Sequence, residues 1–487
     1  MILLSLLRPF QFIVLISIVF GCVTKNRNEN FKVRIQINSK TQRNAEVKLS
    51  SYTLIDKNTL TEARTDSTGF CEVELTIQEP TFALIQIGKK YGEVFLSPGY
   101  NIIVNETDHN YKIPLTFSGK GADVNNYVSW VNSNVESIKW TNGRGLFDLT
   151  KEEFEVRFDS LKRTISDFHL AYIDSINLTD TMISVLDMKN KVKFAAVQQE
   201  YKFYQLVQLS NELRAEHDFK DQSVNLIFDS LLLTDRYSDF YVMLNFYWRA
   251  RIESTVAKYS QTSQEHTIPL ITNSLITEEE YPESIREFLM ALNLQHWLSI
   301  FGLSQETDSV YKVFKMRYSK SRFLPTLQNV YDEWLAVQPG QPAPDFIAYT
   351  SDGNKVTKED FTGKLVYMDV WATWCNPCIA EIPASKKLQA HFRNENRILF
   401  VNVSVDRDES AWLNFLVKEK DWPGLHVRLD QNEIDSFYRK FKLYGIPGYA
   451  LIDSNGNIIN IRAPRPSDMR MKDEIERQLE RFDSPNL

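Results

Sequence analysis

Cysteine is scarce in this chain, which has 487 residues but only four cysteines, at positions 22, 71, 375 and 378. Four cysteines are too few for the disulfide framework that holds small secreted domains together, so each one must be interpreted separately. Glycine is also scarce: its 17 residues are about half of the usual share, which excludes collagen and glycine-rich repeats.

The chain also lacks an excess of positive charge. Its 56 Lys and Arg residues are outnumbered by 63 Asp and Glu, which gives a net charge of -7. This balance argues against a broad basic surface, so we expect no nucleic acid among its partners. The hydrophobic share of 43% is ordinary for a globular protein, and the length suffices for about three domains.

The first 22 residues have the plan of a secretory signal. An apolar run at 12–20 leads into Val19-Phe20-Gly21-Cys22. This tetrapeptide resembles the lipobox of bacterial lipoproteins, although Phe20 is bulkier than the residue usual at its position. The resemblance implies that 1–22 is a lipoprotein signal peptide and that lipidation of Cys22 anchors the chain to a membrane. The alternative is a single transmembrane anchor with Cys22 at its edge. In either case, no later apolar run approaches the ~20 residues that a span needs.

Residues 30–118 show apolar side chains with a period of two, which predicts β-strands. Cys71, for example, begins an alternation of apolar and polar residues that continues to Ile77. The order of strands and turns resembles the small β-sandwich modules that precede thioredoxin-like domains in bacterial lipoproteins. We therefore expect an antiparallel β-sandwich, in which Cys71 faces inward as a buried, unreactive thiol.

Residues 119–337 change to a period of 3.6, which predicts a mostly α-helical domain. Phe154, Phe158, Leu161 and Ile165 follow this spacing. The dense aromatic residues of this region are typical of helix-packing core, and a groove that binds a partner is the alternative. No metal-ligand cluster or phosphate loop occurs here, so the sequence does not reveal the role of this domain.

The last region, 338–487, is predicted to form an α/β domain. Residues 338–344 contain three prolines and one glycine, so they cannot continue a helix and are interpreted as a linker. Beyond them, apolar strands alternate with helical stretches. The predicted strands are 365–371, 397–405, 425–429 and 448–453.

Two of the cysteines carry a chemical signal. Cys375 and Cys378 are separated by two residues and follow directly on the predicted strand 365–371, at a strand-to-helix junction. The unpaired backbone N–H groups at the start of a helix favour a thiolate, so Cys375 is the expected nucleophile and Cys378 the resolving cysteine. A zinc site is not expected, because His391 has no second His three to five residues further on.

The segment 366–383, VYMDVWATWCNPCIAEIP, resembles the active-site segment of the thioredoxin superfamily, and its TlpA/ResA branch in particular. Two further matches are the PAPDF opening at 342–346 and Gly445-Ile446-Pro447, where the superfamily places a cis-proline beside the disulfide. The resemblance covers about residues 340–487. It implies a thioredoxin-like fold with the additional βα element of that branch.

The resemblance also assigns roles to individual residues. Asp369 matches the buried carboxylate that exchanges a proton with the second cysteine, and the alternative is a structural aspartate at a strand end. Glu381 matches an acidic residue of the TlpA/ResA branch that tunes the thiols or contacts substrate, and the alternative is a solvated glutamate. Trp374, Ile446 and Pro447 match positions that contact the substrate.

Taken over as a whole, the resemblance implies a membrane-tethered, periplasm-facing thiol-disulfide oxidoreductase of the cell envelope. It is expected to reduce specific disulfides of envelope proteins and to be re-reduced by a membrane electron donor. No metal or organic cofactor is implied. The alternative is a binding or assembly lipoprotein in which the β and helical domains do the main work and the thioredoxin-like domain is accessory.

Overall fold

The computed structural model describes residues 31–482, apart from 53–54, 56, 108–113, 142–143, 177, 217–237 and 260–266. The predicted signal peptide and Cys22 lie outside the described residues. None of the helices described is both long enough and apolar enough to cross a bilayer. The chain divides into two compact units: the described residues up to 208 together with 238–247, and 209–216 together with the described residues from 248 onward.

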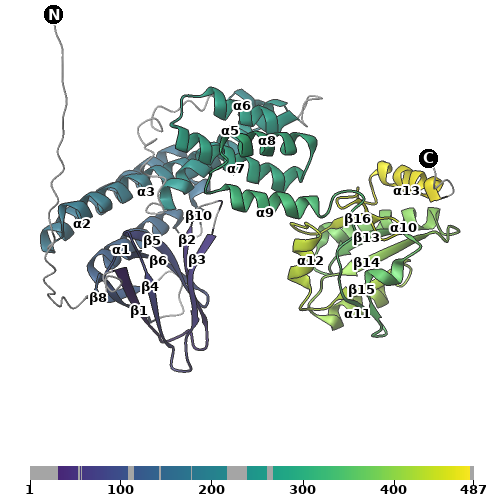
Figure 1. Ribbon diagram of the computed structural model, residues 1–487, viewed down its shortest axis with the longest axis horizontal. Helices are drawn as coiled ribbons and strands as arrows, with labels where there is room; N and C mark the ends of the chain where they lie inside the picture. Colours follow the sequence, from purple (N-terminus) through teal and green to yellow (C-terminus); the bar gives the residue numbers. More distant parts are fainter. Residues whose placement is uncertain are drawn as a thin grey trace, which may run out of the picture. The chain divides into compact units, whose positions relative to one another are not determined.

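The first unit begins with eight strands in two four-stranded sheets (Figure 1). The sheet orders are β4-β1-β7-β8 and β3-β2-β5-β6. The strands are β1 (Lys32–Ser39), β2 (Glu46–Tyr52), β3 (Lys57–Arg64), β4 (Phe70–Thr76), β5 (Thr81–Ile87), β6 (Lys90–Leu96), β7 (Asn101–Glu106) and β8 (Thr116–Lys120).

Apolar residues from both sheets form a single core, in which Val33, Ile35 and Ile85 are fully buried. Cys71 lies in this core as a free thiol whose pKa is raised by burial. The predicted β-rich N-terminal region is confirmed, with one correction to the antiparallel arrangement: β1 and β7 run parallel. Five intervening strands separate these two in sequence, so no hairpin turn obliges them to run in opposite directions.

Helices follow in the same unit. They are α1 (Ala122–Lys139), α2 (Lys151–Ser175), α3 (Asp180–Val207) and the first part of α5 (Ser238–Tyr259). Thr150 caps the start of α2: its side-chain oxygen accepts a hydrogen bond from the backbone N–H of Glu153. The buried Lys189 of α3 lies 2.8 Å from a carboxylate oxygen of Glu93 on β6 and 2.9 Å from one of Asp239 on α5. These ion pairs offset the cost of burying the lysine and tie three elements together.

The second unit contains the remaining helices of the central region. They are α4 (Asn211–Glu216), the rest of α5, α6 (Ile268–Glu278), α7 (Glu283–Phe301), α8 (Gln305–Arg317) and α9 (Leu324–Leu335). The central helical region is confirmed, and its helices are divided between the two units. Gly302 ends α7 with a left-handed φ of 68°, a conformation that favours glycine.

The same unit contains the C-terminal α/β domain, whose seven-stranded sheet has the order β12-β11-β15-β14-β13-β16-β17. The strands β13, β14 and β15 run parallel, and β16 runs antiparallel to β13. The strands are β11 (Ala348–Thr350), β12 (Lys355–Val356), β13 (Leu365–Trp371), β14 (Ile398–Ser404), β15 (Leu425–Leu429), β16 (Gly448–Ile452) and β17 (Ile458–Asn460). The helices are α10 (Asn376–His391), α11 (Glu409–Lys418), α12 (Ile434–Lys440) and α13 (Met469–Phe482).

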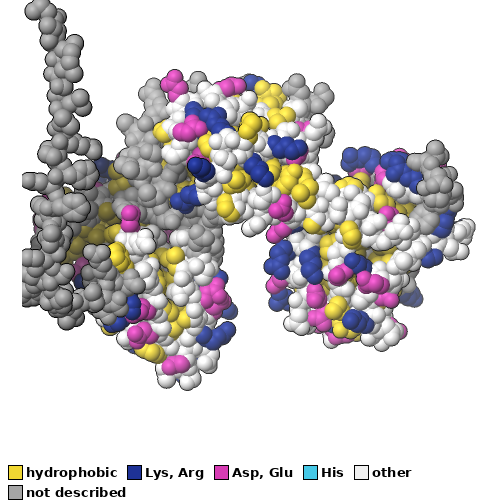
Figure 2. All heavy atoms as spheres, viewed as in Figure 1, with side chains coloured by type: hydrophobic (Ala, Val, Ile, Leu, Met, Phe, Trp, Pro, Cys, Tyr) yellow, Lys and Arg dark blue, Asp and Glu magenta, His cyan; other side chains and the backbone are white. Residues whose placement is uncertain are grey.

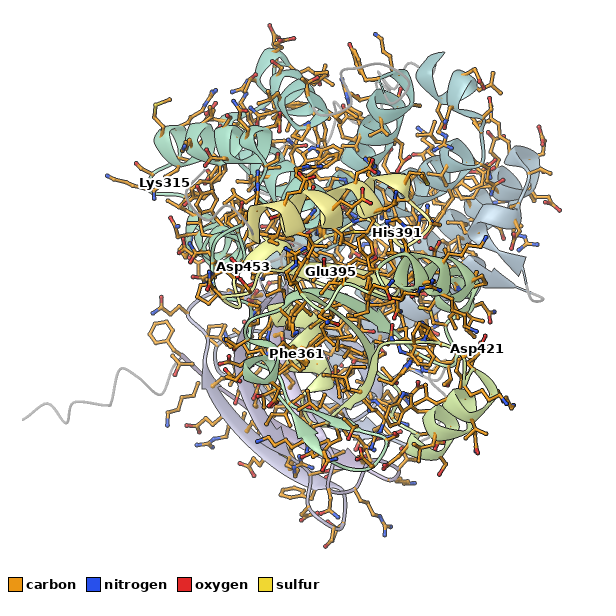
Figure 3. The ribbon with its side chains drawn as sticks, turned by 90° about the vertical axis from the view of Figure 1, so that its right-hand side faces the viewer. Lys315, Phe361, His391, Glu395, Asp421 and Asp453 are labelled. Carbon is orange, nitrogen blue, oxygen red and sulfur yellow. A yellow bond between two sulfur atoms is a disulfide. The ribbon has the colours of Figure 1, made fainter. Side chains whose placement is uncertain are left out.

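Helices α10 and α13 cover one face of this sheet. Leu388 of α10 and Ile475 of α13 share a core cluster with Leu365 and Tyr367, which alternate along β13 and so point to the same face. His391 Nε2 at the end of α10 lies 2.9 Å from Glu476 of α13, which passes close to it in Figure 3. By the same alternation, Asp369 points to the face that these two helices cover.

The segment interpreted as a linker pairs with the sheet edge. The backbone N–H of Gly340 donates to Ile458 at 2.7 Å, and the N–H of Ile458 donates back to Gln341 at 2.8 Å. Ala343 adds a third bond, to Gly456, at 2.9 Å. The segment is therefore fixed along β17.

On the face shown in Figure 2, positive and negative side chains are interspersed, as the near balance of charges predicts.

Candidate active site

Cys375 and Cys378 form a disulfide at the junction of β13 and α10. Their Cα atoms are 5.3 Å apart. Cys375 is the residue before the first turn of α10, and its Sγ accepts a hydrogen bond from the backbone N–H of Cys378 at 3.2 Å. In this disulfide state each cysteine is 4% exposed, so the two cysteines are equally buried.

The loop between β13 and Cys375 is held by Asp406, which follows the end of β14. Its carboxylate accepts hydrogen bonds from the backbone N–H of Thr373 at 3.0 Å and from the Thr373 hydroxyl at 2.7 Å. The hydroxyl of Ser404 donates a further bond at 2.8 Å. Asp406 is buried, so these bonds compensate for the loss of water and fix the backbone that leads to the disulfide.

Asp369 lies inside the sheet, two residues before the end of β13. It is buried, and its Oδ1 has no hydrogen-bond partner among the described residues. In the antiparallel register it lies opposite Tyr449 of β16, whose hydroxyl is likewise buried and has no partner in the described part of the chain. Burial, and to a lesser extent the negative charge of Glu381, raises the pKa of Asp369 to about 8. Such a carboxyl group can give or take a proton near neutral pH.

Glu381 lies one turn after Cys378 on α10 and is only 9% exposed. Its carboxylate accepts hydrogen bonds from the backbone N–H of Ser467 at 3.1 Å and from the Ser467 hydroxyl at 2.9 Å. Arg465 Nη1 lies 3.5 Å from the same carboxylate. The structure therefore does not support a solvated Glu381, and it holds this negative charge close enough to Asp369 to affect its pKa.

The predicted substrate-contacting residues border the same end of the sheet. The peptide bond between Ile446 and Pro447 is cis, and Gly448 pairs with Val370 near the end of β13. Trp374 is 65% exposed beside Cys375. Trp371 is buried against Phe415 and Trp422, so it belongs to the core of the domain.

The structure thus gathers the predicted cysteines and carboxylates at the junction of β13 and α10, with the cis-proline beside the end of β13. Sequence reasoning missed Asp406, Ser467 and Arg465, which hold the site in place. Only Asp406 carried a signal, as an acidic residue directly after a strand end. In the described ranges no group of three His, Cys, Asp or Glu residues could hold a metal ion.

Comparisons with known proteins agree on the nature of this domain. Residues 338–479 match the Redoxin family. The thioredoxin-like protein YneN of Bacillus subtilis is 29% identical over 144 residues, which are 29% of this chain and 81% of that protein. The thiol-disulfide oxidoreductase ResA of Geobacillus kaustophilus is 29% identical over 153 residues, which are 31% of this chain and 82% of ResA.

Among solved structures, the thioredoxin domain of a thiol-disulfide oxidoreductase from Bacteroides vulgatus is similar at 26% identity. The match covers 29% of this chain and 96% of that domain, with a TM-score of 0.27. The sequence matches identify the C-terminal region as a Redoxin domain homologous to the ResA/TlpA group and support redox enzyme activity.

We predict that Asp369→Asn slows release of the mixed disulfide by about tenfold to a thousandfold, because it removes the group that takes the proton from Cys378. In the wild type, the rate of this step should rise with pH around 8, where Asp369 becomes a carboxylate. In the variant the pH profile should change, because the rate then depends on loss of the Cys378 proton without this acceptor. Stopped-flow thiol exchange from about pH 6 to about pH 10 measures both effects.

Asp369→Asn should also change how the free energy of unfolding depends on pH. Between the ordinary pKa of 3.8 and the folded value of about 8, the folded protein holds a proton that the unfolded chain has lost. Wild-type stability therefore falls as pH rises through this window, by up to ~1.4 kcal/mol per pH unit, and Asp369→Asn removes this loss. Urea unfolding at about pH 5 and about pH 8 tests this, and equal pH dependence in both proteins would contradict a neutral, buried Asp369.

Glu381→Gln should lower the pKa of Asp369, because it removes the nearby negative charge, while burial keeps that pKa above its ordinary value. The carboxyl carbon of Asp369, followed by NMR during a pH titration, measures the shift. Glu476→Gln is the matched control, since it removes a partly exposed carboxylate on α13 that is bonded to His391. A titration of Asp369 that is unchanged in Glu381→Gln would show that the two carboxylates are not coupled.

Proposed function

Because residues 338–479 form a Redoxin domain homologous to the ResA/TlpA thiol-disulfide oxidoreductases, we propose that this chain is a membrane-tethered thiol-disulfide oxidoreductase of the cell envelope. Its substrates are disulfides of envelope proteins, which it reduces. The observation that carries the proposal is the Cys375–Cys378 disulfide at the start of α10, in the domain whose buried Asp369 has a pKa of about 8.

The reaction starts from the reduced dithiol. The Cys375 thiolate, favoured by the backbone N–H groups at the helix start, attacks one sulfur of the substrate disulfide and releases the other sulfur as a thiolate. Cys378 then gives its proton to Asp369 and attacks Cys375 Sγ. The second substrate sulfur leaves as a thiolate, and the Cys375–Cys378 disulfide forms. Two electrons pass from the dithiol to the substrate.

The cycle closes when a dithiol donor reduces the Cys375–Cys378 disulfide. A membrane-bound electron donor fits this step, because the reductant must reach a compartment outside the cytoplasm. The reducing direction rests on the resemblance to the TlpA/ResA branch. Exposed Trp374 and the backbone beside the cis-proline, at Ile446, supply the surface on which a substrate strand would lie.

Trapping tests the cycle directly. Cys378→Ala removes the resolving step and leaves the attack by Cys375 intact, so a mixed disulfide with the substrate should accumulate. The adduct is detected in an envelope fraction by non-reducing electrophoresis and identified by mass spectrometry. A variant with Cys375→Ser and Cys378→Ala is the control, because it lacks the nucleophile. A well-folded Cys378→Ala protein without adducts that depend on Cys375 would favour a binding or assembly lipoprotein instead.

Membrane tethering is tested at Cys22, which lies outside the described residues. Cys22→Ser should abolish labelling by a radioactive fatty acid and leave the precursor unprocessed, because the acylated side chain is lost. Cys71→Ala is the control, since that buried thiol should have no part in acylation. A mature N-terminus at any residue other than 22, measured by mass spectrometry, would overturn the lipoprotein assignment.

A further inference from the structure

Trp334, near the end of α9, joins the helices of the second unit to the thioredoxin-like domain. Its side chain is buried, and its ring packs so closely on Gly302 that a Cβ at position 302 would lie 3.0 Å from it. Two cations of the thioredoxin-like domain lie over the same ring, with Lys442 Nζ at 5.8 Å and Arg462 Cζ at 4.6 Å from its centroid. We call Trp334, Lys442 and Arg462 the tryptophan clamp.

Polar contacts fix the clamp in one geometry. Arg462 Nη2 donates to the backbone carbonyl of Ser299 at 3.0 Å, and its Nη1 donates to the carbonyl of Ile300. These carbonyls belong to the last turn of α7, where no backbone partner is available within the helix. Lys442, which is largely buried, lies 2.5 Å from a carboxylate oxygen of Glu333, next to Trp334 in sequence. Arg462 therefore both lies over the Trp334 ring and caps the end of α7, and Lys442 both lies over the same ring and pairs with Glu333.

The clamp reaches the substrate side of the catalytic site through the chain that carries the cis-proline. Lys442 and Tyr444 lie within the five residues before Pro447. The guanidinium of Arg462 also lies over the Tyr444 ring, at 5.6 Å from its centroid. Because Gly448 pairs with Val370 near the end of β13, this chain segment borders the end of the sheet at which Cys375 follows β13.

The clamp leaves two apolar side chains exposed around Arg462. Tyr444 is 68% exposed and Ile300 is 47% exposed, although both are large hydrophobic residues. Tyr444 comes from the thioredoxin-like domain and Ile300 from α7, and Arg462 contacts both residues. We call this pair the ledge. An exposed aromatic ring with a cation on one face has its other contacts available for an apolar group.

We propose that the ledge is a specificity site for the substrate, so that Ile300 of α7 takes part directly in substrate recognition and Trp334 of α9 positions Arg462. Its occupant is an apolar or aromatic side chain next to a cysteine in the disulfide of the substrate protein. Continuity with the cis-proline segment supports this occupant, because a substrate strand bound beside Ile446 to reach Cys375 lies at the same end of the sheet. This inference rests on the proposed oxidoreductase function.

The test compares two synthetic peptides with the same intramolecular disulfide, one with Phe and one with Ser beside a cysteine. The reduced full-length protein should reduce the Phe peptide about tenfold faster, at the low end of what an apolar contact contributes to discrimination. Tyr444→Ala and Ile300→Ser alter exposed positions and should reduce this preference to about twofold or less. Arg462→Ala should also reduce this preference, because it removes the side chain that contacts both Trp334 and Tyr444.

Two controls separate recognition from chemistry. Reduction of 2-hydroxyethyl disulfide, which is too small to reach the ledge, should be unchanged in all three variants. Arg322→Ala removes an arginine that lies over Phe323 within the helical part, and it should keep the peptide preference. A wild type that reduces both peptides at the same rate, or variants that keep the preference for the Phe peptide, would overturn the proposal that the ledge recognises substrate. Activity of the same proteins on the small disulfide would still support the oxidoreductase function. A wild type inactive on both kinds of disulfide would overturn the oxidoreductase and the ledge together.

Discussion

The burial of strand β13 is the constraint on which the catalytic domain depends. All seven of its residues are buried: the strand lies between β14 and β16, and α10 and α13 cover one of its two faces. Burial removes the hydration of Asp369, so this carboxyl group stays neutral at pH values where an exposed aspartate is charged. The end of the same strand delivers Cys375 to the start of α10. One strand, β13, therefore positions both the carboxyl group that exchanges a proton and the cysteine that attacks the substrate.

The sequence revealed the fold best where burial is complete. The predicted strand 365–371 has the bounds of β13, because a strand buried on both faces is a short, mostly apolar run between polar turns. Alternation in the β region predicted which side chains face inward, but it does not determine which strands become neighbours. The parallel pairing of β1 with β7 therefore had no local signal. The division of the helices between two units likewise depends on packing between segments that are distant in sequence.

The catalytic centre was predictable to the extent that its residues are close in sequence. The spacing of Cys375, Cys378 and Glu381 fixes their relation on α10, and alternation on β13 orients Asp369. The supporting residues come from elsewhere: Ser467 is 86 positions from Glu381, and Asp406 is 33 from Thr373. No periodicity links residues so far apart. Their contribution is nonetheless physical, since they fix the charge and the backbone on which the thiols depend.

The pairing of residues 340–343 with β17 also affects how the molecule avoids unwanted association. An open strand at the end of a sheet presents unpaired N–H and C=O groups, which recruit strands of other chains and lead to aggregation. Here the proline-rich segment occupies that position along β17, and prolines are poor partners for a further strand. A fragment that begins after Ala343 would expose this edge and tend to self-associate, whereas one that begins at 338 carries its own edge protection.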